Sequence, residues 1–327
     1  MTLNGGRPTD MATTRVFFTT DIHGADEIFF KFLNVRLVHD VDAIILGGDI
    51  TGKLIIPLVK QADGSYAVEF LGGRWKVKTE AELRELEKAI RRNGFYPYRT
   101  DQTEVKELEY NKQKLDELFS QLMIKRLREW INRAEQRLKG TGILCYVSPG
   151  NDDRFVIDEV LKGSDYVINP EERVIEIDGT HEMITLGWTN PTPWNTPREC
   201  SEEELASKIE AQVCQVKDMN NCIFNLHAPP HDTRIDQAPK LDKTLKPVVI
   251  GSHVQMVPVG SLAVRAAIEK HQPLVGLHGH VHESKGTCKI GRTLCLNPGS
   301  AYQEGVLLGS IVILGDHTIV DYLHISG

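Results

Sequence analysis

Seven histidine, aspartate and asparagine side chains directly follow apolar, strand-like runs at five separate places in the chain. These residues are Asp21, His23, Asp49, Asn151, His227, His280 and His282. Because loops at the carboxyl ends of strands form the binding crevice of an open α/β sheet, we expect these side chains to converge. Imidazole with carboxylate suits manganese, iron, nickel or zinc better than calcium or magnesium. Seven ligands exceed what one ion uses, so the pattern predicts two divalent metal ions, which usually serve in-line displacement at phosphorus.

The local spacing of the first three residues favours metal ligation. Asp21 and His23 are two positions apart, so in extended backbone both side chains point to one face. Asp49 follows two glycines, which allow the backbone to approach a ligand closely. Its carboxylate has two oxygens and is therefore the candidate bridge between two ions.

The elements that must position these residues alternate between strand and helix, which predicts an α/β domain. The runs that we expect to form buried strands are 16–19, 43–46, 143–147, 222–224 and 274–277. The first two are separated by a predicted helix over 27–38, an arrangement that favours parallel pairing.

Residues 54–139 interrupt this alternation, and we interpret them as an insertion into a single domain that spans 1–327. The insertion begins with a predicted β-hairpin that turns at 62–64. The stretch around Pro97 is expected to be irregular, and one long amphipathic helix is predicted over 103–138. We interpret the helices as a helical hairpin for packing or homodimerisation rather than as a cap that takes part in the chemistry.

Composition and charge narrow the class of protein. The chain has 327 residues, of which 41% are hydrophobic and 25% charged, as in ordinary soluble globular proteins. A formal net charge of -7 argues against an extended nucleic-acid surface but not against a small phosphate ester. We find no apolar run of the roughly 20 residues that cross a membrane and no signal-peptide core at the N-terminus. Six cysteines without a C-x-x-C pair suit buried thiols, so we expect a cytoplasmic protein without a membrane partner.

The order of the motifs resembles the calcineurin-like metallophosphoesterase superfamily. D-x-H, G-D, G-N-x-D, an isolated histidine and G-H-x-H follow one another as in that superfamily, over nearly the whole chain outside the insertion. Four stretches resemble one branch of the superfamily more closely, the predicted phosphoesterases related to cyclic-nucleotide phosphodiesterases. These stretches are 48–53, 260–265, 279–284 and 297–300. The resemblance implies a four-layer α/β/β/α sandwich with a dinuclear centre at one end of two packed sheets.

The resemblance also implies two ligand sets. One metal would be held by Asp21, His23, Asp49 and His282, and the other by Asp49, Asn151, His227 and His280. Manganese is the metal that we favour among manganese, iron, zinc and nickel. A hydroxide between the two ions would then attack phosphorus, in a phosphodiester rather than a monoester.

The sequence departs from the superfamily pattern at two linked positions. Asp152 stands where the family has the histidine of its G-N-H motif, and the family's G-D-x-x-D-R is here 48–53, without the second aspartate. The pair that assists the leaving group in the family is therefore absent. We take Asp152 and His278 as candidate acids, and they join the bridging Asp49 as the candidate catalytic residues.

Substrate contacts are expected from Lys53, Arg265 and Asn151. Lys53 is favoured because it follows a ligand by a short turn, whereas Arg265 also suits a helix surface. Trp188 and Trp194 are expected either to wall the substrate cleft or to cover the edge of the core. Two alternatives stay open, a nuclease of the same superfamily and a non-catalytic scaffold. The negative net charge disfavours the nuclease, and the presence of all seven candidate ligands disfavours the non-catalytic scaffold.

Overall fold

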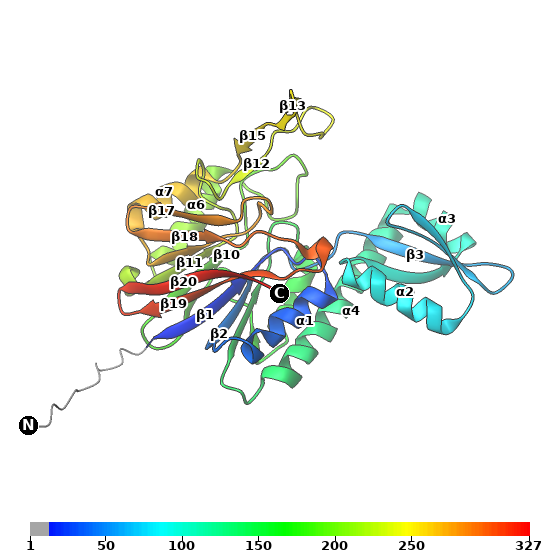
Figure 1. The fold of residues 1–327 in the computed structure, drawn as a ribbon, viewed down its shortest axis with the longest axis horizontal. Helices are drawn as coiled ribbons and strands as arrows, with labels where there is room; N and C mark the ends of the chain where they lie inside the picture. The colour runs from blue at the N-terminus through cyan, green and yellow to red at the C-terminus, as the bar shows by residue number, and fades with distance from the viewer. Residues whose placement is uncertain (1–12) are drawn as a thin grey trace, which may run out of the picture.

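The computed structural model describes residues 13–327 (Figure 1). The N-terminal segment 1–10, in which no signal peptide was expected, lies outside the described residues. Two six-stranded sheets form the centre of the fold, and each is mainly parallel with antiparallel pairing at one or both edges. The predicted α/β class is confirmed.

The first sheet carries the strands that precede three of the predicted ligand loops. Its order is β20 (Thr318–Ser326), β19 (Leu308–Gly315), β1 (Thr14–Thr19), β2 (Ala43–Gly47), β7 (Leu144–Ser148) and β8 (Val167–Ile168). The pairs β1 with β2 and β2 with β7 are parallel. All five residues of β2 are buried, as expected for an apolar run inside a parallel sheet.

The second sheet carries the remaining ligand loops. Its order is β17 (Gly286–Ile290), β18 (Thr293–Asn297), β16 (Val275–Leu277), β11 (Cys222–Leu226), β10 (Glu182–Leu186) and β9 (Val174–Glu176). The strands β10, β11, β16 and β18 run parallel to one another. Their carboxyl ends therefore share one edge of the sheet.

Three buried clusters hold the layers together. One joins side chains of the first sheet, such as Phe18 and Ile45, to Ile223 and Leu296 of the second. A second cluster packs the first sheet against α1 (Asp26–Asn34) and the C-terminal half of α4 (Lys112–Leu138). The third packs the second sheet against α6 (Glu202–Val213) and α7 (Leu262–His271).

The segment after β2 builds a separate four-stranded sheet. Its order is β5 (Gly73–Val77), β4 (Tyr66–Phe70), β3 (Ile55–Lys60) and β6 (Tyr96–Asp101), covered by α2 (Glu80–Arg92). The antiparallel pairing of β3 with β4 confirms the predicted hairpin. In Figure 1 this sheet lies to one side of the two larger sheets.

Two expectations about this segment are wrong. The stretch around Pro97 is not irregular but forms β6, an edge strand that pairs with no strand of residues 13–327 other than β3. Proline is tolerated at such an edge. The single helix over 103–138 is two helices, α3 (Gln102–Tyr110) and α4. Asn111 has a non-helical backbone, and its side chain accepts from the backbone N–H of Lys114 at 3.0 Å. Such local bonds compete with helix continuation.

A slender arm extends from the second sheet. Residues 237–258 form the pairs β12 (Gln237–Pro239) with β15 (Met256–Pro258) and β13 (Val249–Ile250) with β14 (His253–Val254). Figure 1 shows this arm, in yellow, projecting away from the six-stranded sheets. Within residues 13–327, no helix is long and apolar enough to span a bilayer. A cytoplasmic location stays a prediction.

Candidate metal centre

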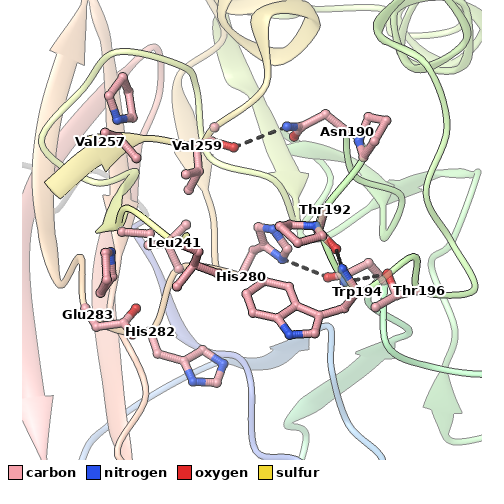
Figure 2. A pocket seen from close by; sticks show the side chains of 18 of the residues that line it. Asn190, Thr192, Trp194, Thr196, Leu241, Val257, Val259, His280, His282 and Glu283 are labelled. Atoms are coloured by element: carbon pink, nitrogen blue, oxygen red, sulfur yellow. Dashed lines mark hydrogen bonds between the residues drawn. The ribbon is translucent and has the colours of Figure 1, made fainter. Parts of the chain in front are cut away.

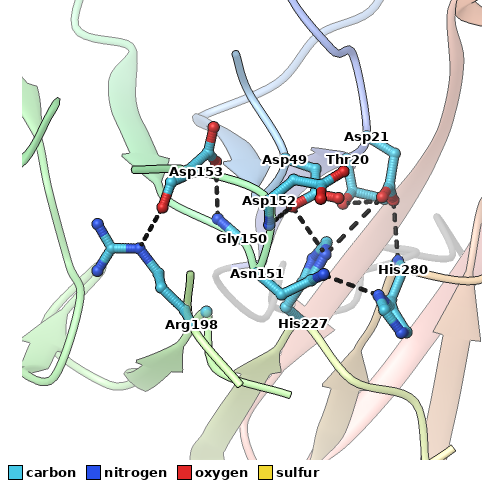
Figure 3. Close-up of polar contacts among 12 residues, drawn as sticks. Thr20, Asp21, Asp49, Gly150, Asn151, Asp152, Asp153, Arg198, His227 and His280 are labelled. Carbon is cyan, nitrogen blue, oxygen red and sulfur yellow. Dashed lines mark hydrogen bonds and ion pairs between the residues drawn. The ribbon is translucent and has the colours of Figure 1, made fainter. Parts of the chain in front are cut away.

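The structure brings all seven predicted ligands to one place. Asp21 and His23 follow β1, Asp49 follows β2, and Asn151 follows β7. His227 follows β11 in the second sheet, while His280 and His282 follow β16. Because the two sheets pack face to face with these strand ends on the same side, loops from both sheets meet there (Figure 3).

One group of ligating atoms surrounds His282. Its Nε2 lies 3.1 Å from Nε2 of His23 and 3.3 Å from Oδ1 of Asp21. Nε2 of His23 is 3.7 Å from Oδ2 of Asp49. Two imidazole nitrogens and carboxylate oxygens that face one point form a donor set that suits a transition metal.

A second group surrounds His227. Its Nε2 lies 3.4 Å from Oδ1 of Asp49 and 3.8 Å from Oδ1 of Asp21. Nδ1 of His280 is 2.8 Å from Oδ1 of Asn151. Asp49 thus presents one carboxylate oxygen to each group, which is the arrangement required of a bridging ligand.

Unpartnered polar atoms show that the residues fit a cation. Among the described residues, Oδ1 of Asp21 and Nε2 of His227 are buried and have no hydrogen-bond partner. A buried polar atom without a partner is costly, and a cation between the carboxylates and the imidazoles would satisfy both. The other nitrogen of His227, Nδ1, lies 3.0 Å from the carbonyl oxygen of Gly47, a bond that fixes the ring orientation.

The pKa shifts follow from crowding of opposite charges in a buried site. Burial lowers the pKa of His227, but Asp49 and Asp21 outweigh it and raise that pKa to about 10. Burial alone would raise the pKa of Asp21 and Asp49. The opposite charge of His227 is the main effect that outweighs burial, so the pKa of both carboxyls is below its usual range. Burial lowers the pKa of His23 to about 3 and that of His280 to about 4.

These shifts have a chemical meaning for metal binding. Without a cation, a proton on His227 neutralises part of the charge of the two carboxylates. Metal ligands must be deprotonated, so metal uptake releases that proton. His23 and His280 are already neutral near pH 7 and are ready to ligate.

The backbone at the ligands adopts a strained conformation. Asp21, His23, Asp49 and His280 have φ angles of 56°, 41°, 50° and 67°, in the left-handed region that side chains other than glycine rarely occupy. Such residues cluster at functional sites. Extended backbone, which we assumed for Asp21 and His23, is therefore wrong at these positions, although both side chains reach the centre.

Two glycines allow the loops to approach one another. A Cβ at Gly150 would lie 2.3 Å from Oδ1 of Asp49, and one at Gly279 would lie 2.5 Å from Oδ2 of Asp21. Both positions therefore exclude any side chain, because such distances are far below van der Waals contact.

Asp153 is a structural residue that sequence reasoning missed. Its buried carboxylate accepts from the backbone N–H groups of Gly150, Ile50 and Thr51 at 2.8, 2.9 and 2.9 Å, and from the Thr51 hydroxyl at 2.6 Å. It therefore ties the loop that carries Asp49 to the loop that carries Asn151. Burial and the charge of Asp49 raise its pKa to about 6, against these hydrogen bonds. Its signal in the sequence is its place as the final aspartate of the G-N-x-D motif, which gives no hint of the bonds it makes.

Asp152, the candidate acid, lies directly beside the candidate metal ligands. Its Oδ2 is 3.9 Å from Nδ1 of His23 and pairs with the ammonium group of Lys53. With His23 and Asp49 it forms a third group of ligating atoms. Burial and Asp49 raise the pKa of Asp152, while Lys53 opposes them. Burial lowers the pKa of Lys53, but Asp152 and Asp49 outweigh it and raise that pKa.

His278 and Arg265 lie outside this cluster. His278 is fully buried, with Nδ1 at 2.8 Å from the carbonyl oxygen of Leu226, and burial lowers its pKa to about 4. Arg265 donates to the carbonyl oxygens of His231 and Asp232 at 2.8 and 2.9 Å. Its guanidinium therefore supports the loop after β11.

A pocket of about 1000 Å³ opens onto the centre (Figure 2). Lys53, Asn151 and Asp152 line it beside the ligands Asp49, His280 and His282. Trp194 also lines the pocket. Of the two expected roles, a wall of the substrate cleft or a cover for the edge of the core, its position matches the first. Trp188 instead packs against Phe155 and the ammonium group of Lys208.

Comparisons with known proteins agree with this geometry. The chain is 34% identical over 159 residues to an uncharacterized protein of Methanocaldococcus jannaschii, covering 48% of this chain and 63% of that protein. It is 26% identical over 149 residues to a UDP-2,3-diacylglucosamine hydrolase of Shigella dysenteriae, covering 46% and 57%. The chain thus spans less than two thirds of either relative. No protein-family model matches it.

The fold is also shared with a solved structure from Thermus thermophilus. The match has a TM-score of 0.52 and 13% identity, and covers 97% of this chain and 99% of that one. The shared fold and a hydrolase among the relatives agree with the resemblance to the calcineurin-like metallophosphoesterases that the motifs indicate.

Proposed function

We propose that this protein is a metal-dependent phosphoesterase that hydrolyses a small phosphate ester, with phosphodiesters favoured, at a dinuclear centre. The observation that carries the proposal is the placement of Asp49. Its two carboxylate oxygens lie 3.7 Å from His23 and 3.4 Å from His227, which belong to separate groups of ligating atoms.

The proposed ligand sets follow these two groups. Asp21, His23, Asp49 and His282 would hold one ion, and Asp49, Asn151, His227 and His280 the other. Two divalent ions bound there, with manganese favoured, would neutralise charge on the phosphoryl oxygens and lower the pKa of an attacking water. The proposal also places this centre in a four-layer α/β/β/α sandwich. The packing of helices against the outer faces of both sheets supports this layering. We further propose that the sandwich is a single domain, interrupted by the insertion at about 54–139.

The chain's own residues then divide the remaining tasks. Lys53 lines the pocket and would hold a phosphoryl oxygen, a task for which Arg265, engaged with the loop after β11, is less suited. Asp152 also lines the pocket and would protonate the leaving group in preference to the enclosed His278. The amide of Asn151 donates to Oγ1 of Thr196 at 2.8 Å, which orients its oxygen toward His280 and the centre.

Hydrolysis of bis(4-nitrophenyl) phosphate with added manganese tests the proposal, with metal content measured on the same samples. We expect two ions per chain and turnover in the wild type. Asp49→Asn should lower turnover at least about 100-fold, because an amide offers only one oxygen for ligation, and should reduce the content to one ion or fewer. Undiminished activity of Asp49→Asn would refute the dinuclear mechanism. The matched control is Asp316→Asn, in the exposed turn between β19 and β20.

A further inference from the structure

The pocket above the metal centre has two chemically different ends. The inner end is polar and carries Lys53, Asn151 and Asp152 beside the ligands. The rest of the lining, called the outer end below, comes from the arm, residues 237–258, and from the loop around Trp194 (Figure 2). The volume of about 1000 Å³ is at the upper end of pockets for drug-sized ligands. A phosphoryl group at the inner end would leave most of it for another part of the substrate.

The arm presents apolar side chains to this outer end. Leu241, Leu245 and Val257 line the pocket together with three prolines of the arm. Leu245 is 48% exposed, and Ile250 farther out on the arm is 61% exposed. On a soluble domain, a contiguous set of exposed apolar side chains marks a binding surface.

The opposite rim adds a large aromatic side chain with few free polar groups beside it. The Trp194 indole is 63% exposed. Most polar groups near Trp194 are already engaged: Thr192 and Thr196 donate to the carboxylate of Glu199, and Asn190 donates to the carbonyl oxygen of Val259 at 3.2 Å. The amide oxygen of Asn190 is left without a partner among the described residues. A nucleobase or sugar would need several free hydrogen-bonding groups on this wall, whereas an alkyl chain needs only contact area.

We propose that the substrate is an amphiphilic phosphate ester, whose phosphoryl group lies at the metal centre and whose alkyl or acyl chain lies along the apolar side of the arm. This inference rests on the proposed phosphoesterase function and adds the class of substrate to it. Both sets of residues line one pocket, so a single molecule can contact both.

Two substrates with the same leaving group test this inference. We choose methyl 4-nitrophenyl phosphate and octyl 4-nitrophenyl phosphate, both used with manganese at concentrations where the octyl ester is monomeric. The two differ by seven methylenes, and burial of only two of them corresponds to about a tenfold gain in binding. We therefore expect KM for the octyl ester to be at least about tenfold lower.

The arm variant Leu241→Ser/Leu245→Ser should bring the ratio of the two KM values close to one. Val320→Ser is the matched control, because Val320 is also an exposed aliphatic residue, at 53%, but lies on the edge strand β20; it should keep the wild-type ratio. Circular dichroism confirms that each variant is folded.

The results of these assays separate the two proposals. If neither ester is hydrolysed, the phosphoesterase proposal fails, and this inference fails with it. If both are hydrolysed with equal KM, the enzyme stands and the amphiphilic substrate is refuted. A wild-type dimer in sedimentation that the arm variant disperses, with an unchanged KM ratio, would show that the arm binds a second copy of the chain instead.

Discussion

Asp153 should control metal affinity without touching the metal. Asp153→Ala removes a buried carboxylate that accepts from three backbone N–H groups, those of Gly150, Ile50 and Thr51. Each buried group left unpaired costs about 1–3 kcal/mol. Because water can enter the vacated space, we expect the lower end of the sum, about 3–4 kcal/mol in the free energy of unfolding.

The effect on the metal follows from what Asp153 joins. Its bonds hold the loop of Asp49 against the loop of Asn151, so their loss should let both ligands move. Removal of an outer partner of metal ligands typically costs 10–100-fold in metal affinity. We therefore expect manganese affinity, measured by isothermal titration calorimetry, to fall by about that factor.

Asp236→Ala is a matched control. Asp236 is as buried as Asp153, at 0% exposed, and accepts from three backbone N–H groups, those of Asp232, Thr233 and Gly260, at 2.9, 2.9 and 3.1 Å. Urea unfolding with a chelator present should show a similar loss of stability for both variants. Only Asp153→Ala should weaken manganese binding. Equal losses of affinity in the two variants would refute the reasoning, since general destabilisation would then explain both.

The site supports three further predictions. Gly279→Ala should weaken manganese binding at least about tenfold in calorimetry, because its Cβ would meet Asp21 at 2.5 Å, while Gly286→Ala, whose nearest contact is 3.6 Å, should not. In metal-free protein, the pKa of His227 is raised from 6.5 to about 10. Protonation of His227 therefore stabilises the fold fully below pH 6.5, and this stabilisation is lost as pH rises through about 10. Thermal unfolding in the presence of a chelator should show this decline, and His227→Gln should abolish the decline. Lys53→Met should raise KM for a phosphodiester about tenfold with a smaller change in kcat, and Lys53→Arg should restore part of the loss; an unchanged KM would exclude a phosphate contact.

The positions of the ligands could be predicted because they depend on topology. Each follows a run that is apolar throughout, and such runs form buried parallel strands whose ends meet at one edge. Sequence could therefore place Asp21 near His227, although more than half of the chain lies between them. The left-handed backbone at these residues could not be predicted, because it is imposed by contacts between loops.

Residues whose roles depend on the direction of the side chain were harder to assign. His278 is two positions before His280, yet the turn at Gly279 sends their side chains to different surroundings, and Nδ1 of His278 faces the carbonyl oxygen of Leu226. The engagement of Arg265 with the loop after β11 likewise depends on where an irregular segment folds. The strand around Pro97 escaped prediction because an edge position, which makes proline acceptable, is a property of the assembled sheet.

The insertion is coupled to the metal centre despite its separate sheet. Arg126 of α4 donates to the carbonyl oxygens of Gly24 and Phe95, both at 2.7 Å, and the hydroxyl of Tyr96 accepts from the N–H of Gly52 at 2.9 Å. Gly24 follows the ligand His23 directly, and Gly52 precedes Lys53. These bonds connect the insertion to the loops that carry His23 and Lys53. The insertion therefore helps to fix the ligand loops, a role that neither simple packing nor dimerisation would require.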